Sequence, residues 1–160
     1  MEPEPDQLPR RERSAVRAIL LDPRQRVLLL RGRDPAATDG AAWWFTPGGG
    51  VRAAEDALSA LRRECWEELG YVPQHFAGPL AHRRYEFAFD EHWLVQETDY
   101  YAASVPFFRP APQRLSDLER RFLLGWRWWP LELVATSNET IYPDDLLALI
   151  GAARPSVATR

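Results

Sequence analysis

The sequence predicts a single α/β domain, because segments with strand character alternate with segments with helix character along its 160 residues. The near-continuous apolar run Val27–Leu30 is typical of a strand that is buried on both faces. On a helix over Asp56–Leu69, an apolar stripe would face a sheet; it consists of Leu58, Leu61, Cys65 and Leu69. These two features favour helices packed on a sheet.

The other elements follow from local signals. Further strands are expected over Ala15–Asp22, Arg26–Gly32, Trp43–Thr46, His82–Phe89, Trp93–Val105 and Trp126–Trp129. Pro47 and the glycines after it would end the third strand in a loop. A helix over Ser116–Leu123 would begin with a serine cap, and a helix over Tyr142–Ala153 has Pro143 and two aspartates at its start.

The predicted domain covers residues 14–153, between a flexible N-terminal tail (1–13) and a C-terminal tail (154–160). The start of the chain is polar and lacks the apolar stretch of a signal peptide. The aliphatic runs are too short to span a bilayer. We therefore expect a cytoplasmic protein with no membrane partner.

Composition excludes several classes of function. The net charge of −3 and the pI near 5.7 argue against binding to a nucleic-acid duplex. Cys65 is the single cysteine, so neither an internal disulfide nor a cysteine-based zinc site can form. The three histidines, at positions 75, 82 and 92, lack the spacing of metal ligands.

Three acids crowd one face of the expected helix. Glu64, Glu67 and Glu68 fall within about 100° of one another on a helical wheel. At a separation of about 5 Å and an effective dielectric near 20, each pair repels by roughly 3 kcal/mol before salt screening. A hard divalent cation such as Mg²⁺ or Mn²⁺ would relieve this repulsion. A solvated acidic face paired with Arg62 and Arg63 is the alternative interpretation.

The residues around these acids follow a recognisable spacing. From Gly49, five residues lead to Glu55 and seven more lead to Arg63; the acids and Gly70 follow. This stretch resembles the signature of the Nudix (MutT-like) hydrolases at all seven fixed positions. Cys65 and Tyr71 stand where that signature has aliphatic residues, and both can fill the same packing role.

The resemblance implies an α/β/α sandwich with a mixed sheet and a loop–helix–loop motif. It implies metal binding by the Gly48 carbonyl and by Glu64 and Glu68, with Glu67 beside them, and an ion pair between Arg63 and Glu55. Gly49 and Gly70 would shape the motif. A further acid from another element would complete the metal site; Glu119 is the candidate and Glu97 is its rival.

The implied reaction is the hydrolysis of a small-molecule diphosphate, in which metal-bound water attacks phosphorus and a carboxylate takes its proton. Glu67 is the first candidate for that proton acceptor, and Glu119 and Glu97 are alternatives. A nucleotide-type substrate is expected. Arg31, Arg33, Tyr85 and Glu97 are candidates to contact it, and a base could stack on Trp43, Trp44, Trp93, Phe107 or Phe108.

Two other functions remain open at this point. One is a nucleotide-binding module or sensor of the same fold without catalysis; the intact acids argue against it. The other is a prenyl diphosphate isomerase, which would need a catalytic cysteine, whereas Cys65 lies on the packing stripe. A homodimer is also left open.

Overall fold

The computed structural model describes residues 3–37 and 39–157. It forms one mixed sheet with the strand order β5-β6-β1-β2-β3-β8, to which β4 adds beside β1 and β7 adds beside β2. The strands are β1 (Arg10–Leu21), β2 (Arg26–Arg33), β3 (Ala42–Phe45), β4 (Gly48–Gly50), β5 (Ala77–Phe89), β6 (His92–Ser104), β7 (Leu123–Pro130) and β8 (Ile141–Tyr142). The pairs β1–β6 and β3–β8 are parallel, and the other pairs are antiparallel.

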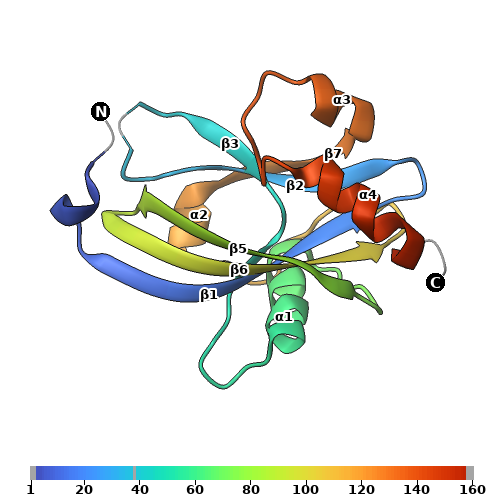
Figure 1. Ribbon diagram of the computed structural model, residues 1–160, viewed down its shortest axis with the longest axis horizontal. Coiled ribbons are helices and arrows are strands. Elements are labelled where there is room, and N and C mark those ends of the chain that lie inside the picture. The colour runs from blue at the N-terminus through green and yellow to red at the C-terminus, as the bar shows by residue number, and fades with distance from the viewer. Residues whose placement is uncertain (1–2, 38, 158–160) are drawn as a thin grey trace.

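Helices pack on the sheet from both sides (Figure 1). The helices are α1 (Ala57–Leu69), α2 (Asp117–Phe122), α3 (Leu131–Thr136) and α4 (Leu146–Val157), and a short 3₁₀ turn covers Pro5–Gln7. Among the described residues, no helix combines the length and apolar character needed to cross a membrane.

Strand β1 separates two hydrophobic clusters. Its even-numbered residues Val16, Ala18 and Leu20 pack with Leu61, Cys65 and Leu69 of α1, whereas Ile19 and Leu21 pack with α4. Leu58, which was predicted as part of the same stripe, lies outside this cluster and is 42% exposed. The alternation follows from the two-residue period of a strand. Strand β2 alternates in the same way over residues 27–30, all of them buried. The structure therefore confirms the α/β sandwich and the strand that is buried on both faces.

The structure differs from the sequence-based predictions at several boundaries. Strand β1 begins at Arg10, so residues 10–13 lie in the sheet and not in a tail; Arg10 pairs with Trp93 and Arg13 pairs with Gln96. Main-chain pairing with β6 holds this polar segment without an apolar pattern. At the other end, α4 begins at Leu146, after β8, and continues to Val157, beyond the predicted end of the domain.

Four short elements were not predicted: the 3₁₀ turn at Pro5–Gln7, β8 and the two elements described next. Gly48–Gly50, expected as a loop, forms β4 and pairs with residues 15–17 of β1. Residues 131–136 form α3, directly after β7. Pairing with β1 determines β4, and α3 forms where the chain leaves β7. Neither segment has a local periodic pattern that would predict it.

Candidate metal and substrate site

Helix α1 presents the motif acids, and both of its ends are fixed locally. The Asp56 side chain accepts a hydrogen bond from the Ser59 backbone N–H at 2.8 Å and caps the first turn. Gly70 ends the helix in the left-handed conformation with φ 67°, which glycine adopts without strain. The three acids are largely buried: Glu64, Glu67 and Glu68 have exposed fractions of 7%, 9% and 3%. A solvated acidic face, the alternative interpretation above, does not describe these residues.

Arg63 joins the loop to the helix. Its Nε and Nη2 donate to the two oxygens of Glu55 at 2.7 and 2.9 Å, which gives the expected ion pair a bidentate geometry. Nη2 also donates to the Gly50 carbonyl at 2.9 Å. Hydrogen bonding by Arg63 lowers the pKa of Glu55 to about 2, so the pair stays ionised down to strongly acidic pH.

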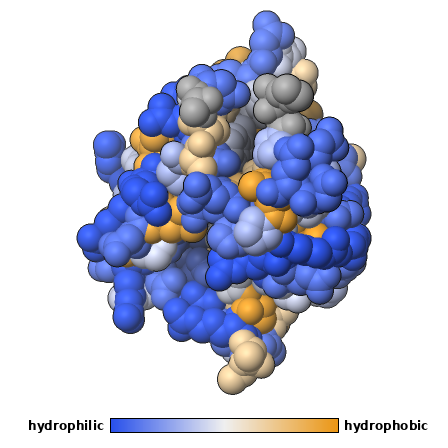
Figure 2. All heavy atoms as spheres, turned by 90° about the vertical axis from the view of Figure 1, so that its left-hand side faces the viewer, coloured by the Kyte–Doolittle hydropathy of each residue, from blue (hydrophilic) through white to orange (hydrophobic). Residues whose placement is uncertain are grey.

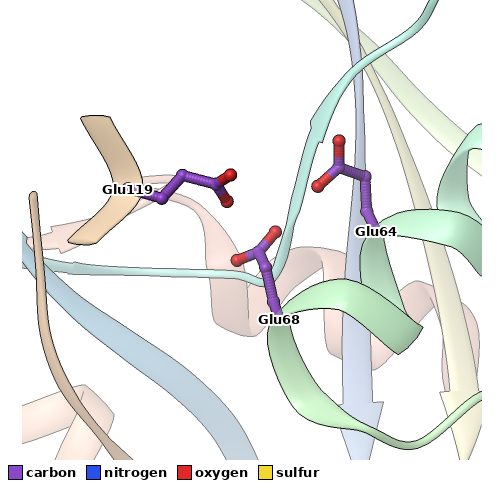
Figure 3. A group of neighbouring side chains, drawn as sticks. All are labelled: Glu64, Glu68 and Glu119. Atoms are coloured by element: carbon purple, nitrogen blue, oxygen red, sulfur yellow. The ribbon is translucent and has the colours of Figure 1, made fainter. Parts of the chain in front are cut away.

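Two of the motif acids meet an acid from another element (Figure 3). One carboxylate oxygen each from Glu64, Glu68 and Glu119 can be chosen so that all three lie within 4.8 Å of one another. Glu119 comes from α2, and in Figure 3 its carboxylate points toward the other two. Among the described residues, this is the group of three acids that could hold a metal ion, and three hard oxygen donors suit Mg²⁺ or Mn²⁺.

The electrostatics of this group favour a bound cation. Burial raises the pKa of Glu64. Burial, followed by the negative charge of Glu64, raises the pKa of Glu68 well above its ordinary value. Both shifts mean that the ionised carboxylates are unfavourable where the fold places them. A divalent cation would remove that cost by supplying positive charge between them.

Glu67 and the Gly48 carbonyl are placed differently from the other expected ligands. Glu67 accepts a hydrogen bond from Arg63 Nη1 at 3.1 Å and is not part of the three-acid group. The Gly48 carbonyl accepts from Arg17 Nη1 at 3.0 Å, while the Gly48 N–H donates to Glu68 Oε1 at 3.3 Å. A carbonyl oxygen has two lone pairs, so one remains for a metal.

The glycines of β4 allow the acids to approach the sheet closely. A Cβ atom at Gly49 would lie 2.6 Å from the Glu64 Cδ, so any side chain there would collide with the carboxylate. Gly48 has φ 143°, a conformation that other residues rarely adopt. Gly49 therefore leaves space for the Glu64 carboxylate, and Gly48 supplies a backbone conformation that other residues rarely adopt.

A polar cavity of about 400 Å³ adjoins the motif. Its lining consists of Glu12, Arg13, Ser14, Arg84, Val95 and Glu97. The link to the motif is direct, because the Val51 N–H donates to the Ser14 carbonyl at 2.8 Å. The face that carries the start of β1 and the β5–β6 connection is mainly hydrophilic, with apolar patches between the charged residues (Figure 2).

Arg13 is one of the cavity residues that sequence reasoning missed. It belongs to the segment that was predicted as a tail, and only its pairing in β1 brings it to the motif. Its Nε donates to Gln96 Oε1 at 2.6 Å, and the buried Gln96 donates in turn to Thr98. Arg13 is an exposed residue of β1, but desolvation of its guanidinium by neighbouring groups, followed by the charge of Arg17, lowers its pKa, whereas Glu64 raises it. Gln96 thus positions the Arg13 guanidinium, whose charge interacts with that of Glu64.

Glu97 lines the cavity but is not in the three-acid group. Its carboxylate contacts His82 Nε2 at 2.6 Å and Arg84 Nη1 at 3.3 Å. Both partners lie on β5, the strand that neighbours β6, so Glu97 is paired with side chains of the sheet. The geometry therefore favours Glu119 over Glu97 as the acid that joins the motif, which makes Glu97 a residue of the cavity.

The remaining substrate candidates lie elsewhere. The Arg31 guanidinium lies over the ring of Trp44, on the face of β2 that packs with α4, and Arg33 is exposed two residues further along β2. The Tyr85 hydroxyl meets the Tyr100 hydroxyl at 2.9 Å, also on the α4 side. Of the aromatic candidates, Trp44 is buried in the α4 cluster and Phe108 stacks on Tyr71. None of these contacts involves Glu64, Glu68 or Glu119.

Comparisons with known proteins agree with this fold and site. A family model described as the NUDIX domain matches residues 11–149. The chain therefore belongs to the NUDIX family of hydrolases. A search of curated protein sequences found no match.

Solved structures with the same fold are distant in sequence. The NUDIX domain of Shewanella oneidensis NrtR, complexed with ADP ribose, superposes with a TM-score of 0.61 at 23% identity, covering 91% of this chain and 88% of that one. A MutT NUDIX hydrolase from Burkholderia pseudomallei gives 0.60 at 22%, covering 88% and 97%. An Ap4A hydrolase from C. elegans, in a binary complex, gives 0.59 at 16%, covering 90% and 98%. At these identities the likeness shows the fold.

The raised pKa of Glu68 predicts how stability depends on pH in the absence of metal. The stability that protonation of Glu68 provides is present below its ordinary pKa of 4.5 and is lost as the pH rises toward the higher folded-state value. We expect Glu68→Gln, measured by thermal unfolding in chelator, to be more stable than the wild type at neutral pH. The two should converge below pH 4.5. The exposed Glu132→Gln is the control, and a destabilised Glu68→Gln at neutral pH would contradict the prediction.

Proposed function

We propose that the protein is a Mg²⁺- or Mn²⁺-dependent hydrolase that cleaves the diphosphate linkage of a nucleotide-type substrate. The observation that carries this proposal is the meeting of Glu64 and Glu68 from α1 with Glu119 from α2. Acids on a single helix would contact a cation from one side. Because Glu119 comes from a separate helix, the three acids could contact a cation from more than one side, and this supports a cation site. The cytoplasmic location, the homodimer and the single domain stay predictions; the predicted limits at 14 and 153 are replaced by a strand that begins at Arg10 and a helix that continues to Val157.

The residues of the site would divide the work among them. Bound Mg²⁺ would neutralise phosphate oxygens and lower the pKa of a water molecule. Glu64, Glu68 and Glu119 would hold the ion. Glu67, held beside them by Arg63 at 3.1 Å, is the proposed proton acceptor. Arg63 would fix the helix relative to the loop through its bidentate contact with Glu55.

Arg13 supports a phosphate-containing substrate. A guanidinium presents a fork of N–H donors that matches phosphate oxygens. The Nε of Arg13 is engaged with Gln96, which orients the fork, and the residue lines the cavity that adjoins the motif. We propose that the two Nη groups contact a phosphate of the substrate, and that the rest of the substrate extends into this cavity.

Metal dependence is the first test. Purified protein should cleave at least one member of a panel of nucleoside diphosphate derivatives when Mg²⁺ or Mn²⁺ is present, with the products identified by mass. Ca²⁺ should bind and support little turnover, because its larger and looser coordination shell would misplace the water. Full activity in excess chelator would refute the metal site. Binding of nucleotides without cleavage of any panel member would favour the non-catalytic binding module.

The choice between Glu119 and Glu97 can be tested with paired variants. Glu119→Gln keeps the acceptor that caps α2, since glutamine can accept from the Ser116 N–H as Glu119 does at 3.0 Å. We expect it to lower kcat about tenfold or more or to demand more metal, with an unchanged unfolding temperature. Glu97→Gln should keep the metal requirement of the wild type. The reverse result in a Mg²⁺ titration would identify Glu97 as the ligand.

Arg13→Ala tests the proposed phosphate contact. Hydrogen bonds to charged groups contribute about 1.5–3 kcal/mol, so kcat/KM should fall about 10- to 100-fold. Metal affinity should stay unchanged, because Arg13 is not a ligand. The control is Arg24→Ala, in the exposed turn between β1 and β2. An unchanged kcat/KM in Arg13→Ala would remove this residue from the site.

A further inference from the structure

Helix α2 carries two functionally different residues within one turn. Glu119 reaches the acids of α1, and Phe122 lies three residues further on. Residues three apart are neighbours on a helix surface, so a displacement of one carries the other with it. The position of Phe122 therefore bears directly on the position of Glu119.

Phe122 occupies the centre of an aromatic cluster. Its ring centroid lies 5.7 Å from that of Trp43 and 5.3 Å from that of Phe45, both in β3. It also meets Phe89, at the end of β5, edge-on at 5.2 Å. One side chain thus joins α2 to two separate parts of the sheet.

Gly32 in β2 provides the space for this ring. A Cβ atom at Gly32 would lie 2.5 Å from Phe122 Cε2 and 3.0 Å from Phe45 Cε1. The backbone of Gly32 is not in the positive-φ region, so conformation does not require glycine here. The requirement is steric: a side chain at position 32 would push Phe122 out of the cluster.

The rest of α2 gives little anchorage. The helix has six residues, none of them fully buried, and a helix of this length is unstable without tertiary contacts. Phe122 is the α2 residue that packs against the hydrophobic cluster of α1. The Ser116 cap fixes the start of the helix but does not tie it to the sheet.

We propose that Phe122, seated in the space left by Gly32, is the positioning residue that holds Glu119 near Glu64 and Glu68 and so sets the affinity of the metal site. This inference rests on the proposed metal site. Metal binding and the docking of α2 are then coupled, and coupling of this kind acts in both directions. A bound ion should hold Phe122 in its aromatic cluster, and displacement of Phe122 should lower the affinity of the site for the ion.

The experiment measures Mn²⁺ affinity without substrate, by electron paramagnetic resonance of the free ion. Gly32→Ala and Phe122→Leu should each bind Mn²⁺ about tenfold more weakly than the wild type, as is typical when a residue that supports a metal ligand is changed. The double variant should bind more tightly than the two single losses predict, because the added methyl group fills space that the ring vacates. Phe107→Leu, an aromatic truncation at a side chain that is 49% exposed, is the matched control.

The outcomes separate this inference from the proposed function. If the wild type binds Mn²⁺ in a Glu119-dependent manner while Gly32→Ala and Phe122→Leu match it, the positioning role is refuted and the metal site stands. If the wild type binds no Mn²⁺, the metal site itself fails. A loss that is no larger than in Phe107→Leu, or a double variant that is strictly additive, also counts against the role of Phe122.

Hydrogen exchange tests the reverse direction of the coupling. Mg²⁺ should slow exchange at the amides of Arg120 and Leu123, which donate to the Ser116 and Glu119 carbonyls. This protection should be absent in Glu119→Gln, even though its helix cap is retained. Equal protection of these amides by Mg²⁺ in the wild type and in Glu119→Gln would show that α2 is not coupled to the metal.

Discussion

The guanidinium of Arg63 is the contact on which the geometry of the site depends. It binds both oxygens of Glu55, the carbonyl of Gly50 and the carboxylates of Glu64 and Glu67. Each of its donor nitrogens is used, and their planar arrangement fixes the directions of the partners together. Because the loop and the helix share this single charged group, the position of one determines the position of the other. A lysine, with one compact ammonium group, could not make this set of contacts.

The site combines a stable frame with an unfavourable charge distribution. The caps of α1, the glycines of β4 and the contacts of Arg63 hold Glu64 in place, although burial raises its pKa and that of Glu68. The strain is electrostatic and lies at the point where a cation would relieve it. Such a site would bind metal with little rearrangement of the helix. The adjustable part is α2, which carries Glu119 on a short helix at the surface.

The cavity beside the motif carries charged groups that suit a substrate with phosphate groups. Arg13 and Arg84 bring positive charge to a lining that also contains Glu12 and Glu97, so the surface offers donors and acceptors together. A diphosphate that lay between the acids and Arg13 would meet the positive charge of the bound metal on one side and a guanidinium on the other. This arrangement supports recognition of a phosphate chain, because a divalent metal and a guanidinium both bind phosphate oxygens.

The sequence by itself determined the parts of the protein whose partners are close along the chain. The pattern of residues 56–69 predicted α1, and the family resemblance carried by the stretch from Gly49 to Gly70 implied the ion pair between Arg63 and Glu55, whose two sides lie in one loop and one helix. The apolar run of β2 likewise predicted burial on both faces. Tertiary structure alone decided what depends on strand pairing. Parallel pairing with β6 placed Arg13 in the sheet, and the fit of Phe122 against Gly32 is made across 90 residues of chain. Glu119 was named as a candidate from its position in the sequence, but its approach to the acids is fixed by the docking of α2, and no local pattern encodes that contact.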